Sequence, residues 1–253
     1  MLTAFASIKG SPGATSVAVA VAARWPTTPA PLLVELDPAG ADLGSRFGLC
    51  DEPGLRAMVA AARYGPLTGE PEWVQRLPFG VDLVVGPCDH SAAHTVTAFA
   101  ESGPAALQDL AAVRPVLLDL GRLDITSPAL PFLDKADRLL VVARPRVEDA
   151  RHVKAALAHL ARRCPVLLVV CGDGPYPAGE IARVLDVPLA ATVRHDPAGA
   201  DIAAGRRHTA SGWTRRPLLR AARGLALALD GAPRPAEART PGRPDPMPVQ
   251  VSA

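Results

Sequence analysis

A glycine-containing loop near the N-terminus carries residue types that bind anions. It runs Ile8-Lys9-Gly10-Ser11-Pro12-Gly13-Ala14-Thr15-Ser16. Apolar flanks predict a strand before it, over Leu2–Ile8, and a helix after it, over Thr15–Arg24. Glycines let backbone N–H groups turn inward, and a helix N-terminus adds positive partial charge. The loop is therefore a candidate phosphate site, in which the Thr15 hydroxyl caps the helix or binds Mg²⁺.

Two residues of the loop depart from the strict phosphate-loop pattern GxxxxGK[ST]. Ile8 stands at its first glycine, and Ala14 stands at its lysine. The lysine would make charge-assisted hydrogen bonds to the phosphates, which contribute roughly 1.5–3 kcal/mol. Its absence predicts a nucleotide affinity lower by about one to two orders of magnitude, and slower phosphoryl transfer.

The loop resembles the deviant phosphate loop of the MinD/ParA family, whose pattern is KGGxGKT[ST]. The matching positions are the signature lysine, two glycines and the hydroxyl pair: Lys9, Gly10, Gly13, Thr15 and Ser16. Ser11 departs from the family pattern mildly and Ala14 departs seriously. The resemblance implies that ATP or ADP, with Mg²⁺, is bound by Lys9, Gly10, Ser11, Pro12, Gly13, Ala14, Thr15 and Ser16.

Two further segments look like the carboxylate motifs of the same family. Residues 32–40 resemble its second motif, D-x-D-P-x-G, and residues 116–121 resemble its Walker B strand. The resemblance implies that Asp37 is catalytic, by positioning the attacking water. It also implies that Asp119, with Thr15, holds hydrated Mg²⁺. The alternative is that both aspartates are ordinary carboxylates that cap loops at strand ends.

Residues 136–142, 181–188 and 194–197 extend the resemblance over about residues 2–230. In the family an Asn after the sixth strand often holds the base. The corresponding residues here are Cys171-Gly172-Asp173-Gly174, which leaves the recognition of adenine without that side chain.

Two functions are compatible with these motifs. The first is a pseudo-ATPase adaptor that keeps the family scaffold, binds a protein partner and helps to position or partition a cellular cargo. The second is a slow ATPase switch in which ATP bridges a homodimer, as in relatives. In a dimer Lys9 would reach a phosphate on the partner subunit; alternatively it is a solvated loop residue. We favour the adaptor, because Ala14 removes the most consequential side chain.

The elements that must position these residues alternate between strands and helices. Apolar runs predict strands over 2–8, 31–36, 81–85, 115–120, 138–143, 166–171 and 190–193. Helical spacing occurs over His152–Arg163 and Ala178–Leu185. This alternation predicts a doubly wound α/β fold, with helices flanking a mostly parallel sheet of seven or eight strands. We expect one domain over residues 1–230 and a proline-rich, disordered tail over 231–253.

Composition excludes several classes of protein. The chain has 253 residues, 49% of them hydrophobic, and a net charge of +2, which does not by itself indicate a nucleic-acid or membrane partner. Its four cysteines are scattered without a CxxC pair, so we expect a reducing cytoplasm and no disulfide framework. No apolar run is long enough to span a bilayer, and the terminal residues lack an amphipathic membrane helix.

Two weaker constellations remain. Cys88, His90 and His94 could form a zinc corner on a helix face, although a chance arrangement at a helix start is the better interpretation. Near the C-terminus six arginines could contact DNA phosphates without sequence specificity, or form a solvated face on the last helix. They are Arg206, Arg207, Arg215, Arg216, Arg220 and Arg223.

Overall fold

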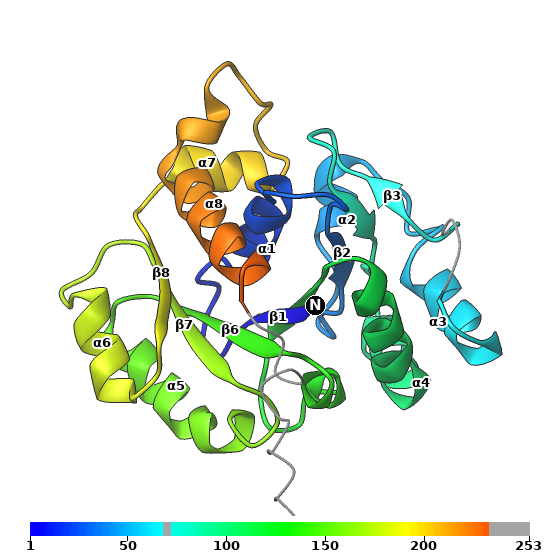
Figure 1. The fold of residues 1–253 in the computed structure, drawn as a ribbon, viewed down its shortest axis with the longest axis horizontal. Helices are drawn as coiled ribbons and strands as arrows, with labels where there is room; N and C mark the ends of the chain where they lie inside the picture. Colours follow the sequence, from blue (N-terminus) through cyan, green and yellow to red (C-terminus); the bar gives the residue numbers. More distant parts are fainter. Residues whose placement is uncertain (68–71, 233–253) are drawn as a thin grey trace, which may run out of the picture.

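The described part of the chain forms an eight-stranded sheet flanked by helices on both faces (Figure 1). The computed structural model describes residues 1–67 and 72–232. The strands, in their order across the sheet, are β3 (Gln75–Arg76), β4 (Asp82–Val84), β2 (Leu32–Glu35), β5 (Val116–Arg122), β1 (Leu2–Ser7), β6 (Arg138–Ala143), β7 (Val166–Cys171) and β8 (Leu189–Val193). All are parallel except the short edge strand β3, which pairs antiparallel with β4.

The central strands are buried on both faces, which explains why their sequences are apolar throughout. Every residue of β1, β2 and β6 is buried. Side chains alternate between two cores, so Ala4 and Ala6 of β1 face one core while Phe5 faces the other. The expectation of a doubly wound, mostly parallel sheet is therefore confirmed.

The helices divide between the two faces. One face is covered by α1 (Ala14–Ala23), α7 (Pro197–Ala203) and α8 (Pro217–Asp230), which lie together in Figure 1. The other is covered by α3 (Leu55–Tyr64), α4 (Ala92–Val113), α5 (Val147–Leu160), α6 (Ala178–Leu185) and the 3-10 helix η1 (Leu130–Asp134). The short elements α2 (Leu43–Phe47) and η2 (Trp213–Arg215) complete the described chain.

Several elements differ from the sequence expectations, among them α5, α4 and β3. Helix α5 begins at Val147 instead of His152, since the side chain of Asp149 folds back onto the Arg144 backbone N–H and organises the first turn. The 22-residue helix α4 was not anticipated, because Gly103 and Pro104 interrupt its pattern. The strand β3 is only two residues long and carries no readable alternation.

Helix α8, the last described helix, ends at Asp230, the final residue of the domain expected from the sequence. Most of the tail expected over 231–253 lies outside the described residues. Within the part of the chain that is described, no helix is both long and apolar enough to cross a membrane.

Sheet order brings the candidate site together. The strand β5 lies between β1 and β2, although it is fifth in the chain. Because parallel strands end at the same edge, the segments that follow β1, β2 and β5 meet there. The loop over 8–13, Asp37 and Asp119 come from these three strands.

Candidate functional site

The loop between β1 and α1 curves through two glycines in the left-handed region. Gly10 has φ of 64° and Gly13 has φ of 101°, conformations that other residues adopt only under strain. Helix α1 starts at Ala14 without a capping side chain and without an acidic residue in its first turn. Its first N–H groups therefore point into the loop without a side-chain acceptor, the arrangement that attracts an anion.

No residue of α1 replaces the lysine that the strict phosphate-loop pattern has at position 14. Ala14 is buried, with 6% of its surface exposed, and its methyl group packs in the core beneath α1. Lys9 is exposed at the other end of the loop. The loop thus offers backbone donors and hydroxyls, but no buried cation.

Asp119 on β5 is joined to the loop through the Thr15 side chain. The carboxylate is 2% exposed and accepts hydrogen bonds from the Thr15 hydroxyl and from the Gly121 backbone N–H, the latter at 3.1 Å. Burial is the largest influence on it and raises the pKa of Asp119 to about 6. A cation bound beside a buried carboxylate would stabilise its charged form.

Glu35 on β2 is a third buried carboxylate, and sequence reasoning missed its importance. It is paired in register with Asp119 and is 2% exposed. Its oxygens accept backbone N–H groups of Asp42, Leu43 and Gly86 at 3.1, 2.9 and 3.2 Å. Burial nevertheless raises the pKa of Glu35 to about 8, with Asp119 adding to the rise. A charged residue inside the apolar run of residues 32–36 was the available signal.

Asp37 lies just beyond β2 and packs against β5. A Cβ built on Gly121 would lie 1.9 Å from Oδ2 of Asp37, so the carboxylate approaches the strand only because residue 121 is glycine. Its Oδ1 accepts the Ala39 N–H at 2.8 Å. Burial raises the pKa of Asp37, while Arg122 lowers it. The structure therefore places Asp37, Asp119 and Thr15 around one end of the sheet.

The donor set at this edge is compatible with hydrated Mg²⁺. Mg²⁺ uses few protein oxygens and keeps several waters, so one carboxylate and one hydroxyl are enough to hold it. Burial raises the pKa values of Asp119 and Asp37, and a bound cation would stabilise their charged forms.

A cavity of about 450 Å³ opens beside the loop. Its size lies within the usual range of small-molecule sites. The lining comes from the loop and α1, from the segment after β6, and from the ends of β7 and β8; it includes Pro12, Gly13, Ser16, Arg144, Cys171, Asp173, Arg194 and His195. The Cys-Gly-Asp segment noted above thus does lie at this cavity.

Solved structures show the same arrangement of elements. A ParA family ATPase from Chlorobium tepidum superposes with a TM-score of 0.69 and 17% identity, covering 90% of this chain and 97% of that one. MinD from Pyrococcus furiosus gives 0.67 and 19%, with coverage of 90% and 97%. MinD from Pyrococcus horikoshii, complexed with Mg-ADP, gives 0.65 and 18%, with coverage of 90% and 95%. The chain has the ParA/MinD fold. No protein-family model and no curated protein matches it.

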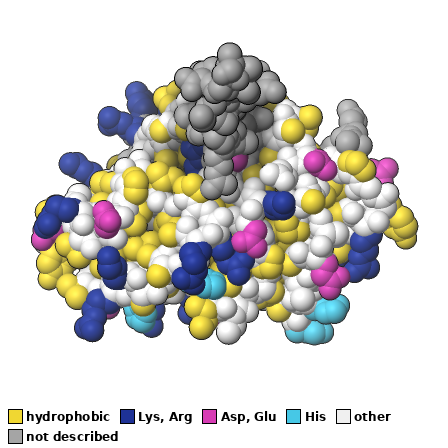
Figure 2. Space-filling model, turned by 60° about the horizontal axis from the view of Figure 1, so that its bottom comes forward, with side chains coloured by type: hydrophobic (Ala, Val, Ile, Leu, Met, Phe, Trp, Pro, Cys, Tyr) yellow, Lys and Arg dark blue, Asp and Glu magenta, His cyan; other side chains and the backbone are white. Residues whose placement is uncertain are grey.

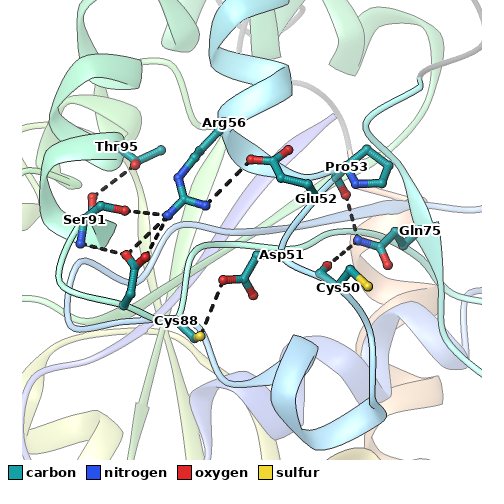
Figure 3. Close-up of polar contacts among 10 residues, drawn as sticks. Cys50, Asp51, Glu52, Pro53, Arg56, Gln75, Cys88, Ser91 and Thr95 are labelled. Atoms are coloured by element: carbon teal, nitrogen blue, oxygen red, sulfur yellow. Dashed lines mark hydrogen bonds and ion pairs between the residues drawn. The ribbon is translucent and has the colours of Figure 1, made fainter.

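Within this ParA/MinD fold, the proposed zinc corner is not assembled. Helix α4 begins at Ala92, so His90 precedes it and does not share a helix face with His94. The Cys88 Sγ lies 3.5 Å from a carboxylate oxygen of Asp51, within the polar network of Figure 3. The described residues contain no group of three or more potential metal ligands.

The same network ties the segment after β2 to the start of α4. Arg56 on α3 donates to Asp89 and to the Ser91 hydroxyl, the latter at 2.7 Å (Figure 3). Gln75 on β3 donates to two carbonyls of residues 50 and 53. The bonds of Arg56 link α3 to the segment after β4, which also carries Gly86, one of the backbone partners of Glu35.

Three of the six C-terminal arginines have ion-pair or hydrogen-bond partners in the described residues. Arg206 pairs with Asp201, Arg216 with buried Asp196 at 3.5 Å, and Arg223 donates to a backbone carbonyl. Arg207, Arg215 and Arg220 are exposed. The leucines of α8 at positions 218, 219, 225 and 229 are all buried. On the face seen in Figure 2, basic side chains are scattered among acidic and apolar ones.

Proposed function

We propose that the protein is a pseudo-ATPase adaptor: it keeps a ParA/MinD-type nucleotide site, turns ATP over little or not at all, and binds a protein partner to position a cellular cargo. The observation that carries this proposal is the buried Ala14 at the lysine position, beside an intact Thr15–Asp119 pair. A scaffold that holds nucleotide without its main transition-state cation favours binding over turnover.

The residues for such a site are those of the loop and the sheet edge. Backbone N–H groups of residues 10, 11 and 13–16 would face the phosphates, and Thr15 and Asp119 would hold Mg²⁺ through its waters. Bound Mg²⁺ would supply charge neutralisation at the phosphates. Asp37, at the same edge, would orient a water. MinD from Pyrococcus horikoshii, which has the same fold, was solved with Mg-ADP.

The first experiment is a titration of the protein with ATP and Mg²⁺, with phosphate release measured in parallel. We expect weak binding and negligible release. Ala14→Lys should raise affinity about 10- to 100-fold, because it restores charge-assisted hydrogen bonds worth roughly 1.5–3 kcal/mol. Tight binding with steady turnover by the wild-type protein would reject the adaptor.

The partner half of the proposal has its own experiment. The tagged full-length chain is used to isolate partners with and without ATP, and a recovered partner is then purified and titrated directly. If none of the recovered proteins binds the purified chain, the adaptor role is contradicted.

A slow ATPase dimer switch is the second candidate, favoured by the retained carboxylates of Asp37 and Asp119 and by the exposed position of Lys9. ATP-dependent dimerisation in sedimentation, lost in Lys9→Ala, together with phosphate release, would establish it. Non-specific DNA binding is tested by Arg215→Glu and Arg216→Glu in a mobility-shift assay at moderate salt. Because Arg216 pairs with buried Asp196, the exposed pair Arg215 and Arg220 makes a cleaner variant.

A further inference from the structure

Arg144, the first residue after β6, lies against the phosphate loop. Its Nη2 donates a hydrogen bond to the Ser11 carbonyl at 3.0 Å, across a sequence separation of 133 residues. Its side chain lines the same cavity as Pro12, Gly13 and Ser16. A guanidinium is thus held beside the loop that has Ala14 in place of the phosphate-binding lysine.

The backbone of Arg144 is fixed independently of its side chain. Its N–H donates to Oδ2 of Asp149 at 3.0 Å, and Asp149 is buried in the first turn of α5. The Arg144 carbonyl accepts the N–H of Arg146 at 2.8 Å, closing a tight turn. The arginine therefore projects from a well-defined position, and little conformational freedom is lost when it binds a ligand.

The charge of Arg144 is not neutralised within the described chain. The ion pairs of the described residues do not include it. Two further arginines, Arg146 and Arg194, line the cavity, whereas Asp196, one of its two acidic residues, already accepts from Gly199 and Leu218 and pairs with Arg216. The cavity wall therefore has an excess of positive charge next to the anion-binding loop.

We propose that Arg144 supplies, from the β6–α5 loop, the phosphate-binding cation that is missing at position 14. A guanidinium carries five N–H donors; one is used on Ser11, and the others are available to a phosphate in a bidentate pair. The ligand is the phosphate chain of a nucleoside polyphosphate. The inference rests on the nucleotide site in the proposed function, but not on the absence of turnover.

The experiment compares Arg144→Gln with Arg146→Gln, its matched neighbour, which also lines the cavity but whose side chain has no hydrogen bond to the loop among the described residues. Affinity for ATP with Mg²⁺, and for AMP with Mg²⁺, is measured by calorimetry for the full chain. Arg144→Gln should weaken ATP binding about 10- to 100-fold and AMP binding much less, since AMP carries a single phosphate. Arg146→Gln should have a clearly smaller effect, and Ala14→Lys added to Arg144→Gln should recover most of the lost affinity.

Thermal unfolding without nucleotide checks that both variants fold as the wild type does. If Arg144→Gln does not fold, Arg144→Lys replaces it and should weaken ATP binding more than Arg146→Lys does, because an ammonium cannot form the bidentate pair. Equal ATP affinity in wild type and Arg144→Gln would overturn the assignment. Equal losses in both Gln variants would also overturn it, because they indicate general electrostatics. If the wild-type protein binds no ATP, the role of Arg144 is overturned as well. The adaptor function would then still be tested by the partner experiment. Steady ATP turnover would reject the pseudo-ATPase function but would not contradict the phosphate-binding role of Arg144.

Discussion

Replacing Glu35 with Gln should change how stability depends on pH. Glu35 is buried on β2 and accepts three backbone N–H groups, so it organises the segments around residues 42 and 86. Its pKa is raised from 4.5 to about 8, chiefly because burial disfavours the charged form. Gln keeps the size and one acceptor oxygen, but cannot ionise.

The direction of the stability change with pH follows from which state, folded or unfolded, binds the Glu35 proton more tightly. The folded protein holds the Glu35 proton up to about pH 8, whereas the unfolded chain releases it near 4.5. The contribution of Glu35 is therefore fully present below pH 4.5 and is lost as pH rises through 8. At about 1.36 kcal/mol per pH unit, the upper limit is about 5 kcal/mol, and we expect a loss on the order of a few kcal/mol.

The assay is urea unfolding of wild type, Glu35→Gln and Glu101→Gln, the last an exposed control on α4, at several pH values from 5 to 8 with Mg²⁺ chelated. The wild type should lose stability relative to Glu35→Gln as pH rises, while Glu101→Gln should follow the wild type. Gln leaves the Gly86 N–H without a good acceptor, but that cost does not vary with pH. Parallel profiles for wild type and Glu35→Gln would refute the buried-carboxylate reasoning.

Two further predictions concern packing. Leu219→Ala on α8 should destabilise the fold by about 2–5 kcal/mol, because Leu219 is 1% exposed in the core. The control is Leu227→Ala on the same helix, which should change stability by under about 0.5 kcal/mol because Leu227 is 52% exposed. Chemical denaturation measures the free energy of unfolding of both variants. Gly121→Ala should lower the thermal midpoint, since its Cβ would strike the carboxylate of Asp37, while Gly179→Ala on α6, with open space around it, should be neutral or stabilising. An unchanged midpoint in Gly121→Ala would mean that Asp37 does not pack there.

Much of the strand pattern was readable from the sequence. Runs such as residues 138–143 and 166–171 match β6 and β7 residue for residue, because strands covered on both faces must be apolar along their whole length. The helix α6 over 178–185 was equally clear from its spacing. The strand β3 and the helix α4 were not, since one is too short and the other carries Gly103 and Pro104 within it.

By itself, the sequence determined the loop chemistry: the glycines that take positive φ, the missing lysine at position 14, and the run of strands and helices that gives a doubly wound sheet. Only the tertiary structure decided which side chains share the site. Inserting β5 between β1 and β2 places Asp119 in register with Glu35, and the turn after β6 carries Arg144 to Ser11. These partners are more than 80 residues apart in the chain, so the order of strands in the sheet brings them together and no local pattern records it.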